Sequence, residues 1–179
     1  ANPIPESLTA TLILSSGTFA GQFGLINNIG GNFVVYGVAK TPYTTVTSGN
    51  ISGPGNITVA DASGWRNGDV VTIGTESVTI SNLSGNSFDI TAVTLTHFAT
   101  NTIRVGNLTR NVLVRSSGTI VTSGGNSAYI RNLVTNTTSF AVSYGEFAYL
   151  GASGAEGFRF DTARGTISSS TIRNGNRGI

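Results

Sequence analysis

Few residues in this chain carry the side chains that enzymes and metal sites most often use. The 179 residues include one histidine, His97, and no cysteine. A transition-metal site takes three or four ligands from His, Cys, Asp or Glu. One histidine among scattered carboxylates therefore predicts no metal site, and we interpret His97 as a half-buried residue that is hydrogen-bonded near a turn.

Carboxylates are the remaining route to chemistry, because two of them can hydrolyse a glycosidic bond. Glu156 and Asp161 are five residues apart in the sequence, and Glu146 lies ten residues before Glu156. Such chemistry needs the two carboxyl groups at about 5 to 9 Å from each other. Arg159 and Arg164 are close in sequence and favour arginine-paired or solvated carboxylates instead. We predict no catalytic residue and no cofactor in this chain.

Arginine and aromatic residues near the C-terminus offer a binding surface that needs no catalysis. Arginine can hold a carboxylate through two parallel hydrogen bonds, and aromatic rings can stack on sugars. The alternative is that exposed arginines only keep a weakly charged chain in solution. The residues predicted to bind an acidic extracellular polysaccharide are Arg159, Arg164, Arg173, Tyr149 and Phe158.

The charge and composition exclude some partners and favour a location. Charged residues make up 10% of the chain, and ten Lys and Arg against eight Asp and Glu leave a net charge of +2. No dense basic stripe is present, which argues against nucleic acid as a partner. No run of about 18 apolar residues occurs, which predicts no membrane insertion. The richness in Thr, Ser and Asn and the single lysine are typical of extracellular or cell-surface β proteins.

Strand signals dominate the whole chain. Short runs rich in Val, Ile, Thr and aromatic residues are bounded by Gly, Asn and Ser, as β-strands are. No window sustains the apolar i, i+3, i+4, i+7 spacing of a helix. We therefore predict an all-β protein. The expected strands include 8–14, 32–36, 70–73, 77–80, 87–90, 112–114, 119–121, 128–130 and 140–142.

The strand pattern changes along the sequence. Residues 66–98 show the alternation of antiparallel hairpins, whereas short apolar triplets recur after Gly- or Asn-containing turns from about residue 107. That rhythm suits the rungs of a right-handed parallel β-helix, a β-solenoid. We predict a hairpin-rich β domain over 1–118 and the first coils of a β-helix over 119–179, continuing beyond the last residue.

Two short motifs have structural explanations. In Trp65-Arg-Asn-Gly-Asp69, we expect Trp65 to be buried across a tight turn, Gly68 to take a positive φ and Asp69 to accept a backbone N–H. The second motif is Leu108-Thr109-Arg110-Asn111 at the start of a strand. Arg110 and Asn111 are expected to bond backbone carbonyl groups of neighbouring coils.

These motifs, in this order and with His97 between them, resemble a known family. They are similar to the domain named for its eight glycines, which occurs in fibrocystin-like proteins and in hyaluronan-degrading proteins of the cell surface. The resemblance covers residues 8–118, and the last third is similar to the parallel β-helix that follows such domains. The hyaluronan-degrading relatives carry a histidine-rich stretch where this chain has 156–161 without histidine, so the resemblance does not extend to that site.

The sequence therefore favours a structural and adhesive β-solenoid module of a larger extracellular or surface-fibre protein. An open solenoid end exposes apolar side chains and unpaired backbone, so the expected partner is another copy or the next repeat. The alternative is a polysaccharide-binding or hyaluronidase-like domain whose catalytic coils lie beyond residue 179. A segment of a viral tail fibre or tailspike is a third hypothesis.

Overall fold

The chain folds into β-strands. The computed structural model describes residues 2–15, 24–122, 127–152 and 156–177. These ranges contain sixteen strands and no helix, which confirms the all-β prediction. The described residues therefore include no helix that could cross a membrane. The contacts divide the chain into two compact units. We call residues 1–38 with 110–179 the parallel unit and residues 39–109 the antiparallel unit.

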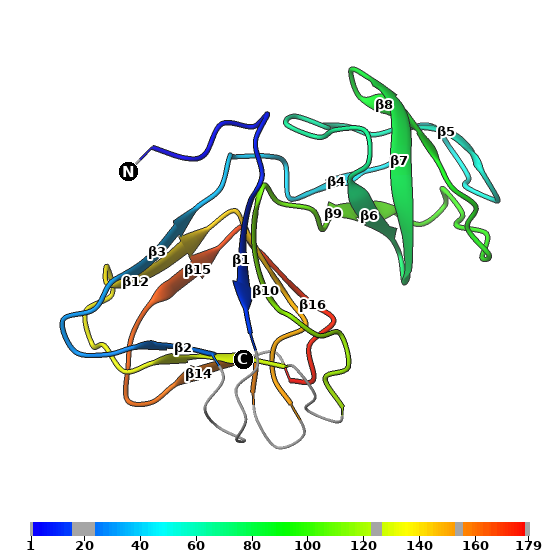
Figure 1. Ribbon diagram of the computed structural model, residues 1–179. Helices are drawn as coiled ribbons and strands as arrows, with labels where there is room; N and C mark the ends of the chain where they lie inside the picture. The colour runs from blue at the N-terminus through cyan, green and yellow to red at the C-terminus, as the bar shows by residue number, and fades with distance from the viewer. Residues whose placement is uncertain (1, 16–23, 123–126, 153–155, 178–179) are drawn as a thin grey trace. The chain divides into compact units, whose positions relative to one another are not determined.

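The parallel unit consists of three sheets in which every strand pairing is parallel (Figure 1). The first sheet has the order β1 (Ala10–Leu14), β10 (Val112–Ser116), β13 (Gly145–Ala148) and β16 (Thr171–Arg173). The second has the order β14 (Phe158–Phe160), β11 (Tyr129–Asn132) and β2 (Gly24–Asn27). The third has the order β15 (Thr166–Ser168), β12 (Phe140–Ser143) and β3 (Phe33–Tyr36).

The chain visits these sheets in a repeating order. Strands β1, β2 and β3 make a first passage through the three sheets, β10 to β12 a second and β13 to β15 a third, and β16 begins a fourth. Each passage adds one strand to each sheet beside the strand of the previous passage. The predicted domain boundary at 118/119 lies inside this unit, between β10 and β11, and the first three strands pair with strands after residue 110.

Equivalent positions on successive strands stack to form the core of the parallel unit. Phe33 lies beside Phe140 with ring centroids 5.4 Å apart. Phe147 on β13 and Phe158 on β14 belong to different sheets and meet edge to face at 4.8 Å, and both are almost fully buried. Contacts of this kind between aromatic edges and faces add to the free energy gained from burial.

A stack of two asparagines continues the same pattern with polar side chains. Asn27 and Asn132 are register partners, and the Asn27 amide donates to Asn132 Oδ1 at 3.1 Å. Asn27 also donates to the carbonyl of Ser139, and Asn132 donates to the carbonyl of Arg164. Because buried backbone carbonyls need donors, this stack supplies hydrogen bonds to turns of successive passages.

The antiparallel unit contains one six-stranded sheet. Its order is β4 (Tyr43–Thr45), β9 (Arg104–Asn107), β6 (Val70–Ile73), β7 (Glu76–Ser84), β8 (Ser87–Ile90) and β5 (Gly55–Thr58), and all its pairings are antiparallel. The predicted hairpins β6–β7 and β7–β8 are confirmed. Trp65 is 5% exposed and packs on Phe88 with ring centroids 5.5 Å apart. Its indole N–H donates to the Thr41 carbonyl at 2.7 Å, so the predicted burial of Trp65 is also confirmed.

One predicted strand is wrong. Thr119 lies in a bend and Val121 in a turn, and Ile120 between them is 62% exposed. The run Thr119-Ile-Val has the composition of a strand, but no neighbouring strand pairs with it among the described residues. Composition reports how well side chains fit a pleated surface, whereas a strand also needs a partner for its backbone.

Candidate functional site

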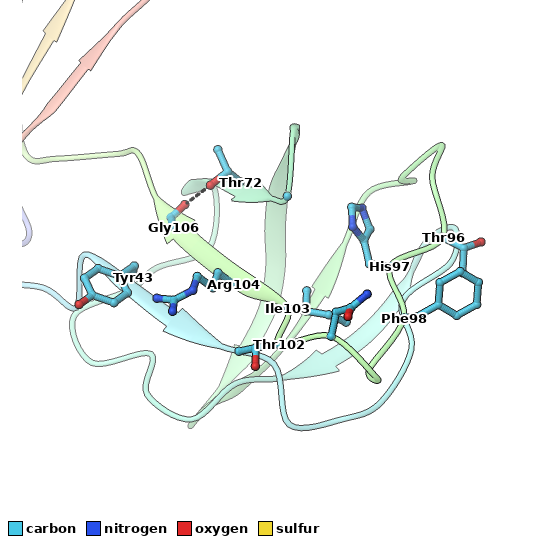
Figure 2. A pocket seen from close by; sticks show the side chains of 11 residues that line it. Tyr43, Thr72, Thr96, His97, Phe98, Thr102, Ile103, Arg104 and Gly106 are labelled. Atoms are coloured by element: carbon cyan, nitrogen blue, oxygen red, sulfur yellow. Dashed lines mark hydrogen bonds between the residues drawn. The ribbon is translucent and has the colours of Figure 1, made fainter.

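A hollow of about 690 Å³ lies on the outer face of the antiparallel unit (Figure 2). Tyr43 on β4, Gly106 on β9 and Thr72 on β6 form one row across its floor, because they are register partners. Their chain neighbours Thr44 and Val105 are buried on the opposite face, as the alternation of side chains along a strand requires. The row therefore faces outward.

Two glycines keep the floor of the hollow bare. A Cβ at Gly106 would lie 3.0 Å from Thr72 Oγ1, and a Cβ at Gly74 would lie 2.9 Å from Cε1 of His97. Gly74 also has a φ of +59°, a region that residues with a side chain rarely adopt. Side chains at these two positions would fill the space in which a ligand could contact the sheet.

The rim of the hollow combines exposed aromatic rings with an exposed arginine. Tyr43 is 63% exposed and Phe98 is 55% exposed. Arg104 is exposed on the same face of β9, two residues before Gly106. No carboxylate among the described residues lies within ion-pair distance of Arg104. In Figure 2, Tyr43 and Arg104 lie at one end of the hollow and His97 and Phe98 toward the other.

His97 is held in place by Glu76. Its Nε2 lies 2.9 Å from Glu76 Oε2, and its side chain is 14% exposed, which confirms the interpretation of a half-buried, hydrogen-bonded histidine. Glu76 also accepts hydrogen bonds from the hydroxyl and N–H of Thr94 and the N–H of Leu95. These hydrogen bonds, led by the Thr94 hydroxyl, lower the pKa of Glu76 to about 2. His97 is thus fixed against an ionised carboxylate.

The aromatic residues predicted for sugar binding are differently placed. Phe158 is 1% exposed and packs among other phenylalanines, so the prediction that it contacts a glycan is wrong. An inward position on β14 explains this, since its register partner Ile130 is buried as well. Tyr149 is half-buried and lies under the guanidinium of Arg115 at 5.0 Å. That arginine occupies one face of the tyrosine ring.

The predicted arginines lie on separate parts of the parallel unit. Arg159 is on β14 of the second sheet, Arg173 is on β16 of the first sheet, and Arg164 is exposed between β14 and β15. They therefore do not form one row along a sheet face.

The carboxylates of this region are paired with arginines, as the sequence favoured. Asp161 binds both Arg131 and Arg159, and hydrogen bonds from Arg159 and then Arg131 lower the pKa of Asp161. Glu146 is buried and binds Arg173, while Glu156 lies 3.7 Å from Arg177. In each pair a guanidinium binds the carboxylate, which a glycosidase would need free.

The turn of the first motif has the predicted geometry. Gly68 has a φ of +90°, and Asp69 Oδ2 accepts the backbone N–H of Arg66 at 3.1 Å. The second motif joins the end of β9 to this turn, because Thr109 Oγ1 accepts the N–H of Val70 and Leu108 donates its N–H to the Val70 carbonyl. The two motifs are therefore neighbours in the folded chain.

Arg110 and Asn111 both bond backbone carbonyl groups as predicted, but the carbonyl that Arg110 reaches does not belong to a neighbouring passage. Arg110 Nε donates to the carbonyl of Ser169 at 3.1 Å. Asn111 Nδ2 donates to the carbonyl of Ile4 at 2.9 Å, and its Oδ1 accepts the N–H of Val38 at 2.8 Å. Both residues bridge segments that are far apart in the sequence.

A buried polar cluster lies inside the antiparallel unit. Lys40 Nζ is 2.8 Å from Asp69 Oδ2, and each of these side chains is 5% exposed. Asn107 is 2% exposed, and its Nδ2 donates to the same oxygen at 2.7 Å. Asn107 Oδ1 in turn accepts the N–H of Thr109 at 2.9 Å. The sequence reasoning assigned Asp69 to its turn but missed Lys40 and Asn107, although the chain has no other lysine.

Neither a metal-binding cluster among the described residues nor a match to a family model or curated protein identifies the site. Within the described ranges, no group of three or more His, Cys, Asp or Glu side chains is arranged to hold a metal ion. No protein-family model and no curated protein matches the chain. The candidate sites are therefore the hollow around Gly106 and the buried cluster around Asp69.

Proposed function

We propose that this chain is a structural and adhesive module built on a right-handed parallel β-helix. The module associates end to end with another copy or with the next repeat of a longer extracellular or surface-fibre protein. The repeating passage through three parallel sheets supports this proposal, because each passage corresponds to one coil of such a solenoid. The stacked phenylalanines and asparagines are the contacts that a further coil would extend.

The surface of the first passage carries the proposal. Strands β1, β2 and β3 each end their sheet, so one backbone edge of each is unpaired among the described residues. Ile13, Ile26 and Val34 are 55%, 54% and 41% exposed on these strands. Exposed edges in monomeric proteins are usually protected by lysine, proline or bulges. An apolar edge of this kind favours pairing with another chain.

The next passage differs at the same positions. The register partner of Ile13 is Arg115, and that of Ile26 is Arg131. Exposed apolar side chains are thus concentrated on the first passage, where the edges are free. Leu12 adds to this contrast, because it is 43% exposed whereas its partner Val114 is 2% exposed. Another layer of strands would bury Leu12 as Val114 is buried.

Sedimentation of the full chain over a range of concentrations tests this function. We expect self-association that is insensitive to chelators and only mildly weakened by salt, because the contact is apolar and made by backbone. Leu12→Lys should reduce the association, because a further layer of strands would bury this position, whereas Leu95→Lys, at a 55% exposed position in the antiparallel unit, should not. A wild-type chain that stays monomeric at all concentrations would contradict the proposal, and a defined trimer would favour the tail-fibre hypothesis.

A second candidate function is binding of an acidic polysaccharide in the hollow of the antiparallel unit. Exposed Tyr43 and Phe98 offer rings for stacking on sugars, and Arg104 offers a guanidinium without a carboxylate partner among the described residues. A bidentate contact to a carboxylate suits such an arginine. This location replaces the predicted surface around Arg159, whose guanidinium already binds Asp161.

Calorimetric titration with a galacturonate oligomer and with its methyl ester tests this second function. The ester removes the charge and leaves the ring unchanged, so we expect binding of the acid and little binding of the ester. Arg104→Gln should abolish the difference in affinity between the acid and the ester, whereas Arg159→Gln should leave that difference unchanged. Equal binding of acid and ester, or loss of binding with Arg159→Gln alone, would refute the assignment.

A further inference from the structure

Lys40 is buried with fewer hydrogen bonds than an ammonium group needs. An ammonium has three N–H donors, and Lys40 Nζ makes one hydrogen bond with the described residues, to Asp69 Oδ2. Its side chain is 5% exposed. A charged group taken out of water is costly unless it is paired and fully hydrogen-bonded. An amide nitrogen in the same place would need one acceptor, and Asp69 supplies one.

We propose that Lys40 and Asn107 become joined by an intramolecular isopeptide bond, with Asp69 as the general acid–base. Lys40 Nζ and Asn107 Nδ2 donate to the same Asp69 oxygen at 2.8 and 2.7 Å. This shared oxygen brings the amine and the side-chain amide together. The amine is the nucleophile, Cγ of Asn107 is the electrophile, and the carboxylate between them can carry protons from one nitrogen to the other.

The reaction is an amide exchange in which no atom is oxidised or reduced. Asp69 takes a proton from Lys40, and the neutral Nζ attacks Cγ of Asn107, forming a C–N bond and placing negative charge on Oδ1. Asp69 then passes its proton to Nδ2 and takes one of the two protons that Nζ still carries, so that the product keeps one amide N–H. Collapse of the intermediate restores the C=O bond, breaks the Cγ–Nδ2 bond and releases ammonia, which leaves with the proton of the original ammonium.

The surroundings support each part of this step. The N–H of Thr109 donates to Asn107 Oδ1 at 2.9 Å, so a fixed donor faces the oxygen on which charge develops. Gly64 lies against the lysine stem, because a Cβ there would be 2.7 Å from Lys40 Cβ. With Asn107 itself 2% exposed, water has little access to compete with the amine.

The product would give the antiparallel unit a covalent closure. The bond would join the segment before β4 to the end of β9. Nearly all of the antiparallel unit lies between these two points in the sequence. A cross-link over a long loop limits the conformations of the unfolded chain. Such a closure does not depend on the end-to-end association proposed above.

Intact-mass spectrometry of the purified wild-type chain tests the inference without any variant. We expect a mass lower than that of the sequence by one ammonia molecule. Trypsin should then fail to cleave after Lys40, and peptide 105–110 should be found attached to peptide 1–66. A folded wild-type chain with the full sequence mass and a free 105–110 peptide would overturn the proposal.

Two controls separate the cross-link from other losses of ammonia. Succinimide formation at Asn67-Gly68 or Asn174-Gly175 also releases ammonia, but it would leave peptide 105–110 free and so count against the proposal. Asp69→Asn should restore the full mass expected for its sequence. Asp61→Asn, at an exposed carboxylate of the same unit, should keep the loss; a cross-link that persists in Asp69→Asn would refute the role of Asp69.

Discussion

The two units bury polar side chains in different ways. The parallel unit stacks equal residues, so that Asn27 and Asn132 repeat the same hydrogen bonds to turns of successive passages. The buried Glu146 of the parallel unit has a partly exposed partner, Arg173, whereas the antiparallel unit buries both members of a charged pair, Lys40 and Asp69, at 5% exposure each. Repeated contacts can be extended by adding passages, whereas a single buried pair cannot. The parallel unit is therefore suited to stacking, whereas the interior of the antiparallel unit offers no contact that a further copy would repeat.

The antiparallel unit should depend most on Trp65. Trp65→Ala removes a buried ring from Phe88 and a hydrogen bond to Thr41. We expect the unit to lose about 3–5 kcal/mol of unfolding free energy, as large aromatic truncations in cores do. Urea unfolding followed by circular dichroism measures this, with the exposed Phe98→Ala as a control of little effect. A Trp65→Ala variant with the wild-type midpoint would contradict the description of this core.

The parallel unit should respond to loss of its asparagine stack. Asn132→Ala leaves the Arg164 carbonyl without its amide donor and takes an acceptor from Asn27. Unsatisfied buried polar groups cost about 1–3 kcal/mol each, so we expect a loss in that range. Amide exchange should place the loss in the parallel unit. The exposed Asn28→Ala is the matched control, and an equal effect of both variants would argue against the stack.

Acid should weaken the antiparallel unit through Glu76. Its pKa is about 2 in the folded chain against an ordinary value of 4.5, mainly because of the Thr94 hydroxyl. A carboxyl with a depressed pKa contributes stability above its unfolded pKa, and this contribution is lost as pH falls through the folded value. Between about pH 5 and 2, the wild type should therefore lose more stability than Glu76→Gln. If the wild type and Glu76→Gln lost the same amount of stability over this pH range, Glu76 would not be the cause of the acid sensitivity.

Local features of the fold were predictable from the sequence. Alternating apolar residues identified the hairpins β6–β7 and β7–β8, and turn chemistry identified the positive φ of Gly68. These features depend on neighbours in the chain. Strands β1 to β3 instead pair with strands after residue 110, so that the whole antiparallel unit separates the partners in the sequence. Alternation along a strand does not specify a parallel or an antiparallel partner.

The candidate sites were harder to predict for the same reason. Arg159 and Phe158 are adjacent in sequence, yet alternation on β14 exposes one and buries the other. Tyr43, Gly106 and Thr72 meet only through the register of three strands. Lys40 and Asn107 meet only at Asp69. A lone lysine in a chain poor in charge is the signal that the sequence did offer.

Hydrogen–deuterium exchange over a concentration series most directly tests the central claim that the first passage is an association surface. As concentration rises, amides in β1, β2 and β3 should become more protected, because their free edges gain partners. Amides of β9 in the antiparallel unit should not change. Leu12→Lys should shift the protection to higher concentration. Protection that is independent of concentration in β1 to β3, or that rises only in the antiparallel unit, would contradict end-to-end association.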